Sequence, residues 1–154
     1  RLRVTGGDVA APPAAFAAGS FDHVMLNPPY LEPGAARAPA LEVRRIATVE
    51  GAATLETWLA RALALLRPRG CVTVIHRADR LGRLLAALAP GCGDLAVYPL
   101  WPRREEPARR VLVQGRRGSG GALRLLPGLV LHDAGGAYTA AAEAVLRDAA
   151  GLVL

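Results

Sequence analysis

Four consecutive residues near the start of the chain have the chemistry of a binding site for a planar amino group. The sequence Asn27-Pro28-Pro29-Tyr30 follows a hydrophobic run, residues 21–26, that indicates a buried strand. Two prolines hold φ at about −65° and donate no backbone hydrogen bond, so the chain leaves the strand along one stiff path. The Asn27 amide and the Pro28 carbonyl supply two hydrogen-bond acceptors, and the Tyr30 ring supplies a flat stacking surface. This pattern suits a planar group that carries an NH2. The alternative is a proline-rich turn in which Asn27 only caps the turn.

The sequence around this motif alternates between short apolar runs and helical patterns, which predicts an α/β protein with βαβ units around a largely parallel sheet. We expect Val4–Val9 to be the end of a strand, Phe21–Leu26 to be the next strand, and residues 31–53 to form an irregular loop that could cover a substrate. A helix is predicted to begin at Leu55 and to be closed by the proline and glycine of residues 68–70. Its apolar stripe at helical spacing, with Trp58 expected in the core, consists of Leu55, Trp58, Leu59, Ala62, Leu63 and Leu66.

The second half of the chain predicts another strand-and-helix unit followed by a hairpin. Residues 71–76 form a β-rich run, and Asp79 stands where it would N-cap a helix over residues 80–88. Two further strand-like segments, 94–100 and 110–114, are joined without an intervening helix, which predicts an antiparallel hairpin. The remaining expectations are an apolar stretch at Leu123–Leu131, a last helix capped by Thr139 and ending at Arg147, and a flexible turn, not a phosphate loop, at residues 116–121.

Length and composition indicate one packed domain. The chain has 154 residues, 52% of them hydrophobic, and a mean hydropathy of +0.25, so a core of real size is expected. No run reaches the roughly 18 apolar residues of a membrane span, and Cys71 and Cys92 match neither a metal pattern nor a disulfide framework. We therefore expect no membrane, no metal and a cytoplasmic location. The first residues match neither a signal peptide nor a starting methionine, so we expect the chain to begin inside a longer protein.

The net charge of +6 comes from arginine alone, since the chain has no lysine. Guanidinium groups form planar forks that bind phosphates, so the surplus favours a polyanionic partner such as RNA. The alternative is that this Ala-, Arg-, Gly- and Pro-rich composition only reflects a GC-rich coding sequence. Arg77, Arg80 and Arg83 flank the predicted strand-to-helix turn, and they are candidates for contacts with substrate phosphates unless they lie on a solvated helix face.

The sequence Asn27-Pro28-Pro29-Tyr30 resembles the amino-methyltransferase motif of class I S-adenosylmethionine (SAM)-dependent enzymes. These enzymes methylate amino groups of adenine, cytosine or guanine, or a glutamine side-chain amide. The resemblance implies that Asn27 and the Pro28 carbonyl accept hydrogen bonds from the target amino group while Tyr30 stacks on the base. The nitrogen lone pair would then be aimed at the SAM methyl group, and transfer would depend on positioning and fixed dipoles rather than on acid or base chemistry.

The tail of the chain carries a narrower likeness, to the bacterial tRNA-valine adenine-N6 methyltransferase family. Members of that family methylate the adenine just 3′ of the anticodon, so the resemblance implies tRNA as substrate and SAM as cofactor. The likeness extends from Gly7 onward, and Gly7-Asp8-Val9 matches the place of an acidic residue that accepts a hydrogen bond from the SAM adenine. The alternative for Asp8 is a turn residue after two glycines. The segments that carry the likeness are residues 75–81, 99–102, 127–133 and 138–139.

The resemblance also implies a fold: the Rossmann-like sheet of class I SAM-dependent methyltransferases, which ends in an antiparallel hairpin. In that family two strands, with a glycine-rich loop for SAM, would precede Arg1. We therefore expect residues 1–154 to be the C-terminal part of a single methyltransferase domain, which binds SAM poorly or not at all when alone.

Two other functions share these features. One is a release-factor glutamine methyltransferase, or another enzyme with the same four-residue motif such as an rRNA guanine-N2 methyltransferase. The other is an inactive RNA-binding fragment that does not hold SAM. The arginine surplus and the tail favour the tRNA enzyme, since a protein substrate gives the arginines no obvious use.

Overall fold

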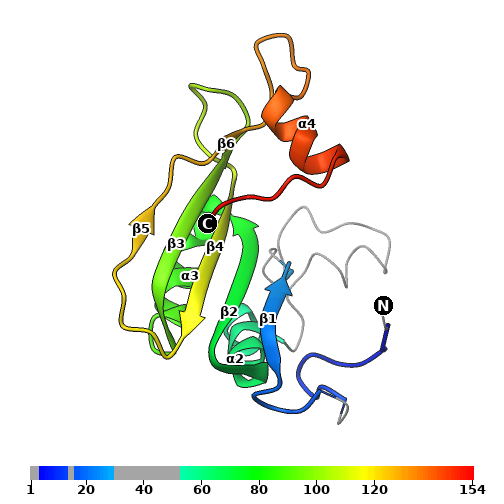
Figure 1. Cartoon of the computed structure of the whole chain (residues 1–154), viewed down its shortest axis with the longest axis vertical. Helices are drawn as coiled ribbons and strands as arrows, with labels where there is room; N and C mark the ends of the chain where they lie inside the picture. The colour runs from blue at the N-terminus through cyan, green and yellow to red at the C-terminus, as the bar shows by residue number, and fades with distance from the viewer. Residues whose placement is uncertain (1–3, 14–15, 30–52) are drawn as a thin grey trace.

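A mixed β-sheet organises residues 4–13, 16–29 and 53–154, the part of the chain that this computed structural model describes. Its strands run in the order β1-β2-β4-β3-β5, and β6 also pairs with β3 (Figure 1). β1 and β2 are parallel, whereas β4 is antiparallel to both of its neighbours. The strands are β1 Phe21–Leu26, β2 Leu66–Arg77, β3 Cys92–Trp101, β4 Arg110–Arg117, β5 Arg124–Leu125 and β6 Leu129–Val130.

The predicted antiparallel hairpin is confirmed as β3 and β4, joined by residues 102–109. β4 lies between β2 and β3, so the sheet combines parallel and antiparallel pairs and is less parallel than we expected. These directions bring the ends of β1, β2, β3 and β6 and the start of β4 to the same edge of the sheet, which we call the carboxyl edge. It is the upper end of the sheet in Figure 1.

Helices α2, Leu55–Leu65, and α3, Leu81–Leu88, cover one face of the sheet, the rear face in Figure 1. Their apolar residues pack with the valines of the strands into one core. α4, Ala140–Arg147, stands apart from this layer and contacts β6. The fully buried side chains of the core include Leu55, Leu59, Leu66, Val72, Val74, Leu84, Leu88 and Val113. None of the described helices has the length and hydrophobicity that a membrane span requires.

Local signals explain where the helices begin and end. Thr139 caps α4 as predicted, because its Oγ1 accepts a hydrogen bond from the Ala142 N–H at 3.1 Å. α2 begins after Thr54, whose side chain accepts from Thr57 N–H. It ends at Leu65, earlier than predicted, because Leu66 is already extended and pairs with β1. The proline and glycine of residues 68–70 therefore lie inside β2 and do not close the helix.

Three other expectations were wrong or lie outside the described residues. Val4–Val9 is not a strand, since no described strand lies beside it to pair with. Asp79 does not cap α3. It lies within a short 3-10 helix, η1 Ala78–Arg80, and pairs with Arg77 instead. Tyr30 and the loop predicted at residues 31–53 fall outside the described residues, except for its last residue.

Candidate cofactor and substrate site

Asn27 leaves the sheet directly at the carboxyl end of β1. Its side chain is exposed, whereas Pro28 and Pro29 are buried. The buried prolines hold the backbone against the protein while the preceding amide stays accessible. An exposed amide thus stands next to a buried backbone segment, and the roles of Asn27, Pro28 and Pro29 in binding an amino group stay predictions. The stacking role of Tyr30 stays a prediction, because that residue is not described.

A cavity of about 230 Å³ lies beside β1, the strand that immediately precedes Asn27, and we call it the α2 cavity. Residues of the segment 5–13, of β1 and of α2 line it. Asp8 and Val9 are among them, and so is Leu26, the residue that immediately precedes Asn27. Asp8, Val9 and Asn27 are the predicted cofactor-binding residues. The structure brings Asp8 and Val9 to the strand that immediately precedes Asn27.

The segment that carries Asp8 is held in a tight turn. Asp8 Oδ1 accepts a hydrogen bond from Ala10 N–H at 2.9 Å, and Arg61 of α2 donates from Nη2 to the Ala10 carbonyl at 2.8 Å. Position 7 requires a glycine, because the backbone there lies so close to Pro13 that a Cβ would be 2.6 Å from the proline ring. Asp8 is therefore a turn residue, as the alternative interpretation held. It also lines the cavity, and its second carboxylate oxygen is not used by this turn.

Trp58 was expected in the core, and this was wrong. It is partly exposed and lines the α2 cavity opposite the Asp8 segment, together with Arg61 and Ala62 on the same face of α2. The apolar stripe predicted the helix face correctly, but helical spacing does not distinguish a core position from a cavity wall. The signal that could have found the difference is Arg61 at i+3, since a charged neighbour indicates the solvent boundary of the stripe.

Arg77 and Arg80, the predicted substrate contacts, lie at the carboxyl edge but outside the α2 cavity. Arg77 donates from Nε to Asp79 Oδ1 at 3.0 Å, and this hydrogen bond lowers the pKa of Asp79 below its ordinary value. Both side chains of the pair line a separate cavity of about 470 Å³, together with Arg109 at the end of the β3–β4 loop and Arg110 at the start of β4. Arg83 pairs with Glu56 of α2, which ties α3 to α2.

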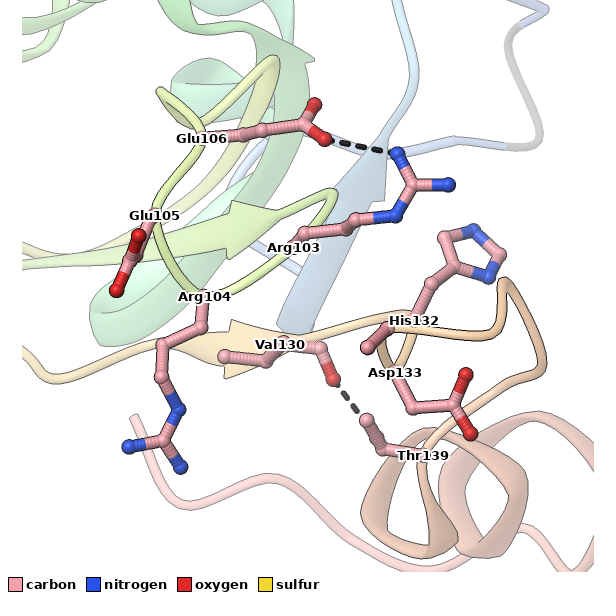
Figure 2. A pocket seen from close by; sticks show the side chains of 9 residues that line it. Arg103, Arg104, Glu105, Glu106, Val130, His132, Asp133 and Thr139 are labelled. Atoms are coloured by element: carbon pink, nitrogen blue, oxygen red, sulfur yellow. Dashed lines mark hydrogen bonds and ion pairs between the residues drawn. The ribbon is translucent and has the colours of Figure 1, made fainter.

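Sequence reasoning missed a third hollow, which lies between the β3–β4 loop and the segment after β6. We call it the hairpin cavity; its volume is about 590 Å³. Figure 2 shows Arg103, Arg104 and Glu106 from the loop around the same space as His132 and Thr139. Within the loop, Glu106 pairs with Arg103 at 2.8 Å. The segment that forms the opposite wall lies about 30 residues later in the chain. No motif in the sequence indicates that these two segments meet.

The described residues contain no group of three histidine, cysteine, aspartate or glutamate side chains that could hold a metal ion. Of the glycine-rich residues 116–121, the first two belong to the end of β4, and the predicted turn begins only at Gly118. After it, Ser119 Oγ donates to Asp94. His76 is buried near the end of β2, with 4% of its surface exposed.

The parallel pair β1–β2 is continued by the reversed strand β4 and then by β3, which runs in the direction of β1 and β2. With the motif at the end of β1, this arrangement defines a mixed α/β sheet of the class I SAM-dependent methyltransferase type. A solved structure with this fold is protein Atu636 of Agrobacterium tumefaciens, described as a predicted O-methyltransferase. The two chains are 26% identical, with a TM-score of 0.68 over 90% of this chain. The alignment covers 59% of the Agrobacterium protein, so the chain spans about three fifths of its length.

A second solved structure, the complex of M1.HpyAVI with SAM, matches 64% of this chain and 44% of its own, with 16% identity and a TM-score of 0.39. No family model and no curated protein matches the chain. The predicted fold and the likeness to SAM-dependent methyltransferases are confirmed. The narrower likeness to the tRNA-valine adenine-N6 family stays a prediction.

Proposed function

We propose that this chain belongs to a SAM-dependent methyltransferase that methylates the exocyclic amino group of adenine in tRNA, of the tRNA-valine adenine-N6 type. The observation that carries the proposal is the placement of Asn27 and Pro28 at the carboxyl end of β1, beside a cavity lined by Asp8 and Val9. In open α/β sheets, ligands bind at this edge of the strands.

The α2 cavity fits the adenine end of SAM. Its walls are largely apolar, with Leu26 and Trp58 available to pack on a flat ring, and Asp8 supplies one carboxylate at the rim. The Asp8 oxygen that is free of the turn would accept a hydrogen bond from the adenine amino group, and the Val9 backbone lies next to it. The volume of about 230 Å³ is below the roughly 300 Å³ at which pockets begin to hold drug-sized ligands. The cavity therefore suits a purine rather than the whole cofactor, and we expect residues 1–154 alone to bind SAM weakly.

In the reaction, bound SAM supplies an activated methyl group. The Asn27 side-chain carbonyl and the Pro28 carbonyl accept hydrogen bonds from the two N–H groups of the target, which aims the nitrogen lone pair away from them. The buried prolines keep these two acceptors in place before the substrate arrives, so little reorganisation is needed. Tyr30 would hold the base by stacking, and Arg77 and Arg80 would contact phosphates.

The choice of an amino group rests on the acceptors. A hydroxyl target, as in an O-methyltransferase, must lose a proton to a base, and an amide and a peptide carbonyl are weak bases that suit an NH2 better.

The choice of RNA over a release-factor glutamine rests on the arginines at the carboxyl edge. The cavity of about 470 Å³, which is lined by Arg77, Arg109 and Arg110 and by Asp79, lies there, on the same edge as Asn27.

The test is transfer of labelled methyl from SAM, with the chain expressed together with any coding sequence that precedes it in frame. The substrates are unmodified total tRNA and, in parallel, a release factor, and products are identified after digestion. N6-methyladenosine is the expected product. A labelled glutamine or a methylated hydroxyl would overturn the proposal and identify that group as the target. Label in neither substrate would favour an inactive RNA-binding fragment.

The Asn27→Ala variant tests the mechanism in the same assay. Loss of one fixed acceptor is expected to raise the barrier by about 3 kcal/mol, which lowers kcat roughly 100-fold, while SAM affinity changes little. Asp22→Ala is the matched control, because it removes a polar side chain of similar size from the other end of β1. An equal loss of kcat and of SAM binding in the Asn27 variant would make Asn27 a structural residue.

A further inference from the structure

The arginine-lined cavity at the carboxyl edge, which we call the Arg77 cavity, has the size of a ligand site. Its volume of about 470 Å³ lies within the range of roughly 300 to 1,000 Å³ that ligand pockets occupy. It lies where β2 ends and β4 begins, at the upper end of the sheet in Figure 1. The described residues that line it are Arg77, Asp79, Ala108, Arg109 and Arg110. The proposed mechanism uses only Arg77 among them.

Two of these arginines stand directly opposite each other in the sheet. Arg77 of β2 and Arg110 of β4 are partners in the antiparallel ladder, so their side chains leave the same face of the sheet. The Ala78 N–H donates to the Arg109 carbonyl at 3.0 Å, which fixes the backbone of the neighbouring arginine against the end of β2. Like charges at directly opposite positions destabilise a ladder. The fold therefore holds positive charges together here, and a bound anion would relieve their repulsion.

Two of the described carboxylates pair with arginines of this cavity, and they do not balance its charge. Asp79 forms a forked pair with Arg77, in which Nε donates to Oδ1 at 3.0 Å and Nη2 donates to Oδ2. Glu106 lies outside the lining, and its Oε2 is 3.7 Å from Arg109 Nη2. Its Oε1 pairs more closely with Arg103, at 2.8 Å, so it offsets the charge of Arg109 only in part. Within the described lining, one carboxylate is set against three arginines.

Arg110 is the arginine of the lining whose charge is not compensated. It is exposed, and no hydrogen bond or ion pair joins its guanidinium to any of the described residues. The surroundings add further positive charge: the hydrogen bond from Arg77 and, to a lesser degree, the charge of nearby Arg80 lower the pKa of Asp79. A guanidinium group offers a planar fork of N–H donors that fits phosphate oxygens. The surplus and the donor geometry together favour a phosphate as the ligand.

We infer that the Arg77 cavity holds a phosphodiester of the RNA substrate, with Arg109 and Arg110 binding its oxygens beside the Arg77–Asp79 pair. The inference rests on the proposed function, since it takes RNA as the substrate, and it adds Arg109 and Arg110 to the residues that contact that substrate. No aromatic side chain is among the described residues of the lining, so the site binds the backbone rather than a base. Such contacts position a nucleic acid and do not read its sequence.

The position of the site fits an RNA strand that also reaches Asn27. Leu26, the residue before Asn27, pairs with Val74 of β2. Arg77 lies three residues further along β2 and pairs with Arg110 of β4. Two strand spacings of about 4.8 Å and three residues of about 3.3 Å each separate the Cα atoms of Leu26 and Arg110 by roughly 14 Å. On the order of a few nucleotides span this distance, so the phosphate belongs to a nucleotide near the target base.

The first test measures binding of the chain to a fluorescently labelled, unmodified tRNA transcript by anisotropy over a range of salt concentrations. Arg110→Ala is expected to weaken binding about tenfold and to reduce the slope of log K against log[salt] by about 1. Arg67→Ala is the matched control, because it removes the same charge at the start of β2, at the opposite end of the sheet, where Arg67 pairs with Asp22. Equal affinities and equal salt slopes for the two variants would overturn the inference.

The second test looks for a gain of binding, which damage to the fold does not produce. Asp79→Asn removes the one carboxylate of the described lining, so it is expected to tighten tRNA binding about threefold. Asp22→Asn is the matched control, because Asp22 forms an exposed ion pair with Arg67 as Asp79 does with Arg77. An Asp79→Asn variant that binds tRNA no more tightly than Asp22→Asn would overturn the inference.

Competition distinguishes a site for RNA from a site for free phosphate. Unlabelled tRNA and inorganic phosphate are each added to the complex of wild-type chain and labelled tRNA, at constant ionic strength. Unlabelled tRNA should displace the label at a far lower concentration of phosphate groups, because several contacts hold the polyanion at once. Displacement by inorganic phosphate at the same concentration of phosphate groups would overturn the assignment to RNA.

These results also separate this inference from the proposed function. Wild-type chain that binds tRNA, with the Arg110 and Asp79 variants no different from their controls, would reject the Arg77 cavity as a phosphate site and leave tRNA as the substrate. Variants that behave as expected, in an enzyme that transfers no methyl group to tRNA, would support the phosphate site and reject the proposed function. Failure of the wild-type chain to bind tRNA at any salt concentration would reject both.

Discussion

The ion pair between Glu56 and Arg83 predicts a measurable dependence of stability on pH. Glu56 lies in the first turn of α2 and Arg83 lies on α3, and two hydrogen bonds join them, Nε to Oε1 at 2.6 Å and Nη2 to Oε2 at 2.7 Å. The hydrogen bonds from Arg83 lower the pKa of Glu56 from 4.5 to about 2. The change to be made is Glu56→Gln, which keeps the size of the side chain and removes its charge.

The magnitude follows from the pKa and the exposure. A carboxyl whose pKa falls from 4.5 to about 2 would contribute roughly 3 kcal/mol to the free energy of unfolding if it were shielded from water. The side chains of Arg83 and Glu56 are 33% and 50% exposed, so solvent screening reduces this value and we expect about 1 kcal/mol. Because the pKa is lower in the folded state, the contribution is present above about pH 4.5 and is lost as the pH falls through about 2.

Urea unfolding followed by circular dichroism at pH 7, 4 and 2 measures this. The wild type should be about 1 kcal/mol more stable than Glu56→Gln at pH 7, and the two should converge near pH 2. Glu105→Gln is the control, since Glu105 lies in the exposed β3–β4 loop, and it should match the wild type at every pH. A Glu56→Gln variant as stable as the wild type at pH 7, or a gap that does not close at low pH, would refute the reasoning.

Two further changes test the backbone. Gly128→Ala should destabilise the chain by about 2 kcal/mol or more, because Gly128 has φ of +83° and a Cβ would lie 2.3 Å from the Pro99 carbonyl oxygen. Thermal unfolding checks this against Gly120→Ala, whose Cβ would meet nothing within 4 Å, and equal melting temperatures would contradict it. Thr139→Ala should cost about 1 kcal/mol through loss of the α4 cap, and Thr139→Ser should restore it. Urea unfolding measures the stability of both Thr139 variants, and a Thr139→Ala variant as stable as the wild type would show that the cap is not needed.

Much of the local structure could be predicted from the sequence, because short-range chemistry determines it. Phe21–Leu26 is a strand, but it is not the buried strand that we expected, since none of its residues is buried and Met25 is 76% exposed. The β3–β4 hairpin follows two apolar runs without a helix between them, and Thr139 caps the helix that ends at Arg147. In each case the deciding residues lie within one element or its immediate neighbour. Leu66 shows the limit of this reasoning, because pairing with Phe21 overrode a helical pattern that continued through it.

The sites were harder to predict, because distant segments form them. The α2 cavity combines residues near Asp8 with residues near Trp58, and the hairpin cavity combines Arg104 with His132. Nothing in the spacing of either pair indicates that they meet. The placement of β4 between β2 and β3 decides which loops share the carboxyl edge, and strand order is set by packing over the whole sheet rather than by any one run of residues.

The position of β4 also has a consequence for the order in which the chain folds during synthesis. β4 is paired on both sides, yet residues 110–117 are made after β1, β2 and β3. Until then β2 has no neighbour on its inner side, and β3 has no described long strand to pair with. The β3–β4 hairpin closes only the short loop 102–109, so it can form quickly once β4 emerges, whereas β2 must be recruited across a longer separation. β4 therefore joins the parallel pair β1–β2, with the Asn27 motif at its end, to β3, and these two parts of the described sheet become connected only after residues 110–117 have been made.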